Sequence, residues 1–139
     1  MFKTKIKYTD FIGNEQEEVL RFNLSEDELR TLIDEDKSFD PSYLAYVSSE
    51  QNFMAMYKIV RKLILKSYGV MSEDAKYFDK SDEVTNRFLH SAVYQEFLDY
   101  LMDGEDLDKL RAFITGVFPK KFSEEIAKQI TTSNLSVVQ

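Results

Sequence analysis

The spacing of apolar residues changes once along this chain, and the change falls at Ser25. Before it, apolar and polar side chains alternate along two stretches, as in an antiparallel strand with one face in water. Beyond it, apolar residues recur at i, i+3, i+4 and i+7, which is typical of amphipathic helices. We therefore predict a mainly α-helical α+β fold, in which a small N-terminal antiparallel β-hairpin precedes a compact bundle of about five to six helices.

The hairpin is predicted from two alternating stretches, the second at about 18–24, joined across Gly13-Asn14. Their apolar positions include Phe2, Ile6, Tyr8, Leu20, Phe22 and Leu24. A two-residue loop would mix the two faces, whereas a loop of odd length places all of these side chains on one face. We therefore expect Tyr8 to lie opposite Leu20. The same register places Ile6 opposite Phe22.

Helices are expected at about 26–35, 52–67, 73–79, 82–102, 105–115 and 123–130. Ser25 fits the N-cap of the first helix, and Glu28 completes a capping box with it. Gly69 suits the position just after the second helix, and Ser72 suits the N-cap of the third. Residues 1–130 are expected to form a single domain, with the hairpin at 1–24, the helices at 25–130 and a flexible C-terminal tail at 131–139.

The composition argues against catalysis and metal binding. The 139 residues include no cysteine and one histidine, which excludes a zinc finger, a thiol nucleophile and any metal site with two imidazoles. That histidine, His90, is expected in mid-helix with a structural or solvent-facing role. A calcium loop starting at Asp34 needs glycine and glutamate where Phe39 and Ala45 stand. We expect no enzyme activity, no cofactor and no metal.

Acidic and basic residues are unevenly distributed. The net charge is −7, from 18 Lys and Arg against 25 Asp and Glu, so binding to nucleic acid is not expected. Residues 53–69 contain four bases and no acid, whereas residues 71–108 contain eleven acids and three bases. This asymmetry predicts that the two segments face each other, within one subunit or between two.

The four bases of residues 53–69 share one face of the predicted 52–67 helix. They are Lys58, Arg61, Lys62 and Lys66. A nucleic-acid interface needs a basic surround that these residues lack, and four charges are few for a helix on a membrane surface. Two interpretations remain, a solvated helix face or a docking surface for an acidic protein segment.

A set of short stretches between residues 20 and 120 contains no catalytic signature but stands in a distinctive order. They are Phe-Asn-Leu-Ser at 22–25, Leu-Ile-Leu-Lys-Ser-Tyr-Gly at 63–69, Ser-Glu-Asp at 72–74, Phe-Asp-Lys-Ser-Asp-Glu at 78–83, Ala-Val-Tyr-Gln-Glu-Phe-Leu at 92–98 and Phe-Ile-Thr-Gly-Val-Phe-Pro at 113–119. In this order the chain resembles the tail assembly chaperones of long-tailed bacteriophages. Ala75 stands where the resemblance leads us to expect glycine.

The resemblance implies a protein-binding role without catalysis. Such chaperones bind the tape measure protein, keep it soluble and help tail tube protein subunits to polymerise around it in the host cell cytoplasm. Residues 1–5 also lack the apolar core of a signal peptide, which predicts a soluble intracellular protein with no membrane contact. The alternatives are a small helical virion structural or regulatory protein without chaperone activity and, third, a metal-free hydrolase.

A second candidate partner-binding group lies near the end of the chain. It comprises Phe113, Val117, Phe118 and Phe122. Because the chain turns at Gly116 and Pro119, we expect part of this group to be exposed in the isolated subunit. Another subunit or the tape measure protein would then cover it, so self-association is expected. The bases of the 52–67 helix would orient an acidic surface of the neighbour.

Overall fold

Four β-strands, five α-helices and one 3-10 turn make up the described part of the computed structural model, which comprises residues 1–40, 42–43, 46, 53–103 and 108–122. In chain order they are β1 (Phe2–Thr9), β2 (Glu15–Phe22), α1 (Glu26–Glu35), the 3-10 turn η1 (Lys37–Phe39), α3 (Phe53–Ser67), β3 (Tyr68–Met71), β4 (Phe78–Asp79), α4 (Asp82–Leu89), α5 (Ala92–Met102) and α6 (Asp108–Val117). The strands form one antiparallel sheet in the order β1-β2-β3-β4. The predicted α+β class and N-terminal hairpin are confirmed, but the sheet has four strands instead of two.

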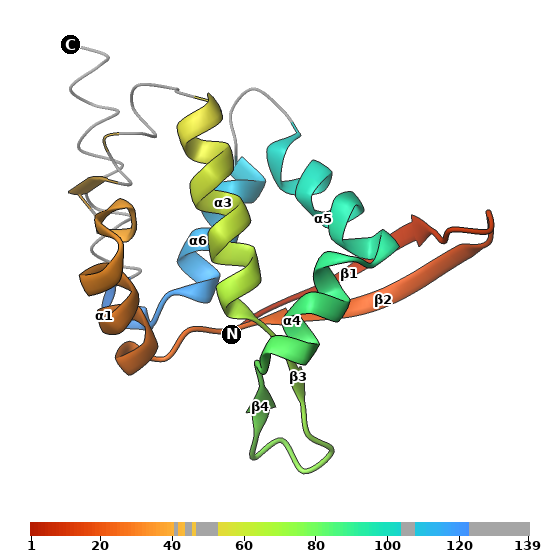
Figure 1. Cartoon of the computed structure of the whole chain (residues 1–139), viewed down its shortest axis with the longest axis horizontal. Coiled ribbons are helices and arrows are strands. Elements are labelled where there is room, and N and C mark those ends of the chain that lie inside the picture. The colour runs from red at the N-terminus through yellow and green to blue at the C-terminus, as the bar shows by residue number, and fades with distance from the viewer. Residues whose placement is uncertain (41, 44–45, 47–52, 104–107, 123–139) are drawn as a thin grey trace.

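The β1–β2 hairpin is the longest arm of the sheet and reaches beyond the helices. Figure 1 shows the hairpin in red and orange, with its tip past the end of α5 and with α1 at the opposite end of the molecule. Helices α5 and α6 pack against β1, and α4 packs against β3 and α3. The helices therefore cover the base of the hairpin and leave its tip projecting.

The register of the hairpin differs from the prediction. Tyr8 lies opposite Gln16, not Leu20, and Ile6 lies opposite Glu18, so the expected pairs are wrong. The antiparallel pairing itself is present. Each partner in β2 is shifted by four residues toward the N-terminus. An even shift keeps every side chain on its own face of the sheet, so the alternation of apolar residues could not distinguish the two registers.

The hairpin loop, residues 10–14, sets this register, and one carboxylate holds it. Asp10 Oδ1 accepts hydrogen bonds from the backbone N–H groups of Ile12 and Asn14 at 3.1 and 2.9 Å, and Oδ2 accepts from Gln16 Nε2 at 3.0 Å. Gly13 has a φ of +90°, which glycine adopts without steric cost. The bond from Gln16 and those from the loop N–H groups lower the pKa of Asp10. The loop is therefore built around an ionised side chain.

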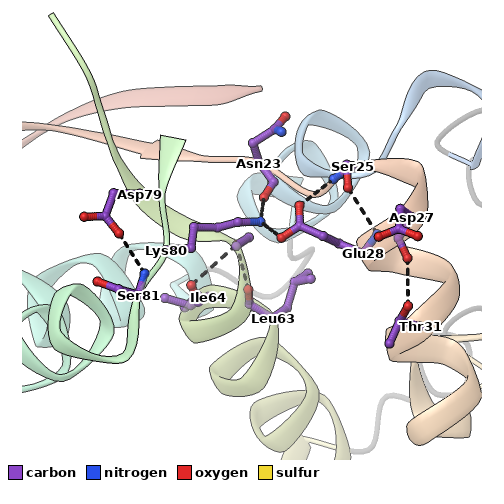
Figure 2. Close-up of polar contacts among 11 residues, drawn as sticks. Asn23, Ser25, Asp27, Glu28, Thr31, Leu63, Ile64, Asp79, Lys80 and Ser81 are labelled. Atoms are coloured by element: carbon purple, nitrogen blue, oxygen red, sulfur yellow. Dashed lines mark hydrogen bonds and ion pairs between the residues drawn. The ribbon is translucent and has the colours of Figure 1, made fainter. Parts of the chain in front are cut away.

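Helix α1 begins at the predicted cap. Ser25 Oγ accepts from the Glu28 N–H at 3.1 Å, and the Glu28 carboxylate accepts from the Ser25 N–H at 3.0 Å, which confirms the capping box. Figure 2 shows Lys80 forming an ion pair with the same carboxylate and donating to the Asn23 carbonyl at 2.9 Å. One lysine thus joins the segment after β4 to the link between β2 and α1.

The β3–β4 hairpin replaces the helix predicted at 73–79. Helix α3 runs directly into β3, so Gly69 lies in the sheet and does not cap a helix. A Cβ at Gly69 would stand 2.5 Å from the Phe78 ring, so this close approach requires glycine. Ser72 Oγ accepts from the Tyr77 N–H at 3.1 Å within the turn. Pairing of β4 with β3, at Val70↔Asp79 and Met71↔Phe78, satisfies backbone groups of β3 that a helix at 73–79 would have left unpaired.

The longest predicted helix is divided into α4 and α5. Ser91 separates them, because its Oγ accepts from the Tyr94 N–H at 3.3 Å and donates to the Phe88 carbonyl at 2.6 Å. The bend brings both Phe88 and Phe97 within contact of Phe22. The single helix predicted at 82–102 is therefore replaced by two helices, and both contact the Phe22 ring.

Helix α6 extends further than predicted, to Val117. Gly116, expected beyond the end of the helix, lies inside it, and a Cβ there would stand 2.9 Å from the Phe2 ring. Glycine therefore lets α6 lie close to β1. The predicted helix at 123–130 and the predicted tail at 131–139 lie outside the described residues.

The Phe22 ring lies at the centre of the core and is fully buried. Its centroid is 4.8–6.3 Å from those of Phe2, Tyr68, Phe88, Phe97 and Phe113. These partners come from β1, β3, α4, α5 and α6, so one side chain joins the hairpin to most of the fold.

Replacing Phe22 by alanine should lower the free energy of unfolding by about 3–5 kcal/mol, because the variant loses buried area and leaves a cavity. Tyr77→Ala is the matched control, since that ring is 72 % exposed, and should change stability by no more than about 0.5 kcal/mol. Urea unfolding followed by circular dichroism measures both. Similar losses for the two variants would contradict the central role of Phe22.

Ala75→Gly should stabilise the protein, by up to about 1 kcal/mol. Ala75 has a φ of +61°, a left-handed conformation that costs an L-residue about 1–2 kcal/mol and glycine almost nothing. Ala112→Gly, at an exposed position inside α6, is the control and should destabilise by about 1 kcal/mol. Urea unfolding of both variants tests the difference in sign, and a loss of stability in Ala75→Gly would be the contrary result.

Candidate functional site

The four bases predicted to bind a partner lie on the exposed side of α3. They are Lys58, Arg61, Lys62 and Lys66, and all four are exposed. The opposite side of the helix is buried through Met56, Ile59, Val60, Leu63 and Ile64. The amphipathic pattern of the sequence therefore places the charges in solvent, as expected.

A hollow lined by both apolar and polar side chains adjoins these bases at the start of α3. It has a volume of about 470 Å³, and its lining includes Tyr43 and Met54 together with Asp36, Lys58 and Lys62. Phe53 and Met54, at the first turn of the helix, are 58 % and 57 % exposed. We call the four bases and this hollow together the α3 surface. It combines a positive charge with apolar side chains that have no cover within the described part of the chain.

One base of the α3 surface is paired within the subunit. Lys62 Nζ donates to Asp36 Oδ2 at 2.5 Å and lies 5.8 Å from the centroid of the Phe39 ring. Asp36 also caps η1 by accepting from the Ser38 N–H at 3.0 Å and its hydroxyl at 2.7 Å. The bond from Lys62, and then those from Ser38, lower the pKa of Asp36 to about 2. This pair fixes one edge of the hollow.

The other three bases retain charge for a partner. Lys58 forms no ion pair with any described residue. Arg61 lies near the Tyr94 hydroxyl, whose pKa is raised by burial and lowered in part by the guanidinium charge. Lys66 borders a second hollow, beside Leu24 and α1. The ion pair of the α3 surface thus runs to Asp36 and not to the acidic segment at 71–108, where sequence analysis expected a partner.

Three of the four members of the second predicted group are buried within the subunit. Phe113, Val117 and Phe118 are each no more than 3 % exposed, so these three do not form the exposed part that the sequence led us to expect. The reason is that α6 continues through Gly116 onto the hairpin, where Phe113 meets Phe2 at 5.2 Å between ring centroids. Phe122, in contrast, is only partly buried against the core.

Sequence analysis missed the two most exposed large apolar side chains among the described residues, Phe11 and Ile12, which are 82 % and 84 % exposed in the hairpin loop. The available signal was two large apolar residues between Asp10 and Gly13-Asn14, which are turn formers. They were overlooked because the predicted register treated this stretch only as a connection.

The titratable groups of the described residues serve structural roles in several places. His90 ends α4, and its Nδ1 lies 2.8 Å from the Asn86 carbonyl oxygen. Within the described ranges, no three His, Cys, Asp or Glu side chains gather in a way that could hold a metal ion. The described helices include none with the length and apolar character to cross a membrane.

The described residues form an α+β fold that displays the exposed bases of the α3 surface. Compared with models of known protein families, residues 1–139 match the family described as phage tail assembly chaperone. The chain therefore belongs to the phage tail assembly chaperone family. A search of curated proteins and a search of solved structures returned no match.

The Asp36–Lys62 pair predicts a pH dependence. Because the pKa of Asp36 falls from 3.8 to about 2 on folding, its ionised form stabilises the fold above pH of about 4. That stabilisation is lost as the pH falls through about 2. As the pH falls from about 4 to about 2, the urea midpoint of unfolding should therefore decrease more for wild type than for Asp36→Asn. Asp34→Asn, an exposed acid of α1, is the control and should follow wild type. If the urea midpoints of Asp36→Asn and wild type changed equally with pH, the stabilising role of the Asp36–Lys62 pair would be refuted.

Proposed function

We propose that this protein is a tail assembly chaperone that binds the tape measure protein, keeps it soluble in the host cell cytoplasm and promotes polymerisation of the tail tube protein around it. The observation that carries the proposal is the family match over residues 1–139. The role is one of protein binding without catalysis.

The α3 surface is the docking site in this proposal. Its bases attract an acidic segment, and the hollow beside Met54 accepts apolar side chains from the same segment. An amphipathic client segment with acidic residues beside an apolar stripe matches both features. Binding there covers apolar surface of the client that would otherwise aggregate.

The charge of the protein supports a solubilising role. A net charge of −7 disfavours self-aggregation while apolar residues such as Phe53 and Met54 remain exposed. The positive charge of the α3 surface is local within an acidic molecule. An acidic client segment is therefore directed to α3 and repelled elsewhere.

Co-expression with the tape measure protein tests this function. Wild-type chaperone should raise the soluble fraction of the client, and Lys58→Glu should reduce that gain because it places a like charge against the acidic segment. Affinity of the purified pair should fall about tenfold, with a smaller difference at high salt. Isothermal titration calorimetry measures the affinity.

The matched control is Lys76→Glu. Lys76 is an exposed lysine in the β3–β4 turn, away from α3, and its side chain forms no ion pair with a described residue. The Lys76→Glu substitution changes the net charge by the same amount as Lys58→Glu and should leave the soluble fraction of the client as it is with wild type. An insoluble client with wild-type chaperone would overturn the proposed function, and equal losses in the two variants would overturn the assignment to α3.

A further inference from the structure

The tip of the β1–β2 hairpin presents two adjacent apolar side chains to solvent. Phe11 and Ile12 are more exposed than any other large apolar side chain in the described ranges. Single exposed apolar residues are ordinary on protein surfaces, but a contiguous pair at the end of a projecting arm indicates a contact site. Figure 1 shows that the tip extends past α5, where no element of the same subunit covers it among the described residues.

The loop that carries this pair has a defined conformation before any partner binds. Three hydrogen bonds to the Asp10 carboxylate hold it, and Asp10 N–H donates to the Asn14 carbonyl at 2.9 Å. Because the backbone is already ordered, docking of Phe11 and Ile12 costs little conformational entropy. The apolar pair is therefore a pre-organised anchor.

The end of the hairpin is acidic on balance, because the acids of the loop and β2 outnumber Lys5 and Lys7 of the paired strand β1. Residues 10–18 contain four acids and no base, namely Asp10, Glu15, Glu17 and Glu18. Glu17 forms an ion pair with Lys5 at 3.1 Å, and Glu18 accepts from the Tyr8 hydroxyl at 3.3 Å. Asp10 and Glu15 form no ion pair with a described residue. A surface complementary to this tip would combine a hollow containing apolar side chains with adjacent basic residues.

The α3 surface has the complementary arrangement. Residues 53–69 contain four bases and no acid, and three of them, Lys58, Arg61 and Lys66, remain beside the Lys62–Asp36 pair and oppose in sign the acids of residues 10–18. The hollow beside Met54 and Tyr43 lies next to Lys58, so apolar and charged features adjoin there as they do on the hairpin. Electrostatic and apolar complementarity therefore coincide on these two surfaces of one chain.

We infer that the hairpin tip of one copy docks on the α3 surface of a second copy, with Phe11 and Ile12 in the hollow and the acids beside Lys58 and Arg61. Figure 1 shows the tip and α3 well apart in one subunit, so the contact forms between subunits. The two surfaces differ, so the contact is head-to-tail and builds chains or closed rings. This inference rests on the proposed function in one respect, because both use the α3 surface. The hairpin of a neighbouring copy and the client would therefore compete for it.

Two variants disable one surface each. Phe11→Ser/Ile12→Ser removes the anchor, and Met54→Ser/Lys58→Glu alters the hollow and its adjoining charge. All four side chains are exposed, so both proteins should fold as wild type does, which circular dichroism and urea unfolding check. Sedimentation velocity of the isolated protein should show oligomers for wild type, weaker at high salt, and monomers for each variant alone.

An equimolar mixture of the two variants separates a head-to-tail contact from a symmetric one. The intact hairpin of the α3 variant should dock on the intact α3 surface of the hairpin variant. Since the remaining two surfaces are disabled, the mixture should stop at a heterodimer and form no longer species. Tyr77→Ser, at another exposed aromatic side chain, is the control and should associate as wild type does.

Monomeric wild type at about 100 µM, a concentration at which even weak micromolar contacts are populated, would overturn the inference. So would a mixture of variants that stays monomeric while wild type associates. The proposed function fails separately, through an insoluble client in co-expression. Hairpin variants that lose self-association and still solubilise the client would support both the inference and the proposed function.

Discussion

The fold depends on the burial of one aromatic ring, Phe22, at the end of β2. Its contacts with Phe97, Phe113 and three further rings bring together elements from both ends of the described chain. Because these helices converge on the base of the hairpin, none of the described helices covers its far end. The projecting tip is thus a consequence of where the core lies.

The hairpin has one half buried in the core and one half exposed, and the exposed half is the part that can contact other proteins. The buried half anchors the sheet, and the acidic, apolar-tipped half stands available for contact. On the other side of the molecule, α3 turns its apolar face into the same core and its bases outward. Two surfaces of opposite charge therefore arise from one packing arrangement, and membership of a tail assembly chaperone family implies interaction with tail proteins.

Features that depend on near neighbours could be predicted well. The Ser25 capping box and the bounds of α1 follow from residues within one helical turn, and the exposed bases of α3 follow from helical spacing. The exposure of the charged half of the candidate site could be predicted for that reason. The adjoining hollow could not be predicted, because Tyr43 and Met54 come from separate segments that only the fold brings together.

By itself the sequence determined the α+β class, the start of α1, the amphipathic character of α3 and the resemblance to its family, since each is written in local spacing or residue order. Tertiary structure decided the β3–β4 hairpin, the packing of α4 and α5 on either side of Ser91 and the burial of Phe118. In each case local preference allowed more than one answer. Contacts with distant residues, above all with the Phe22 ring and the edge of β2, supplied the free energy that selected one.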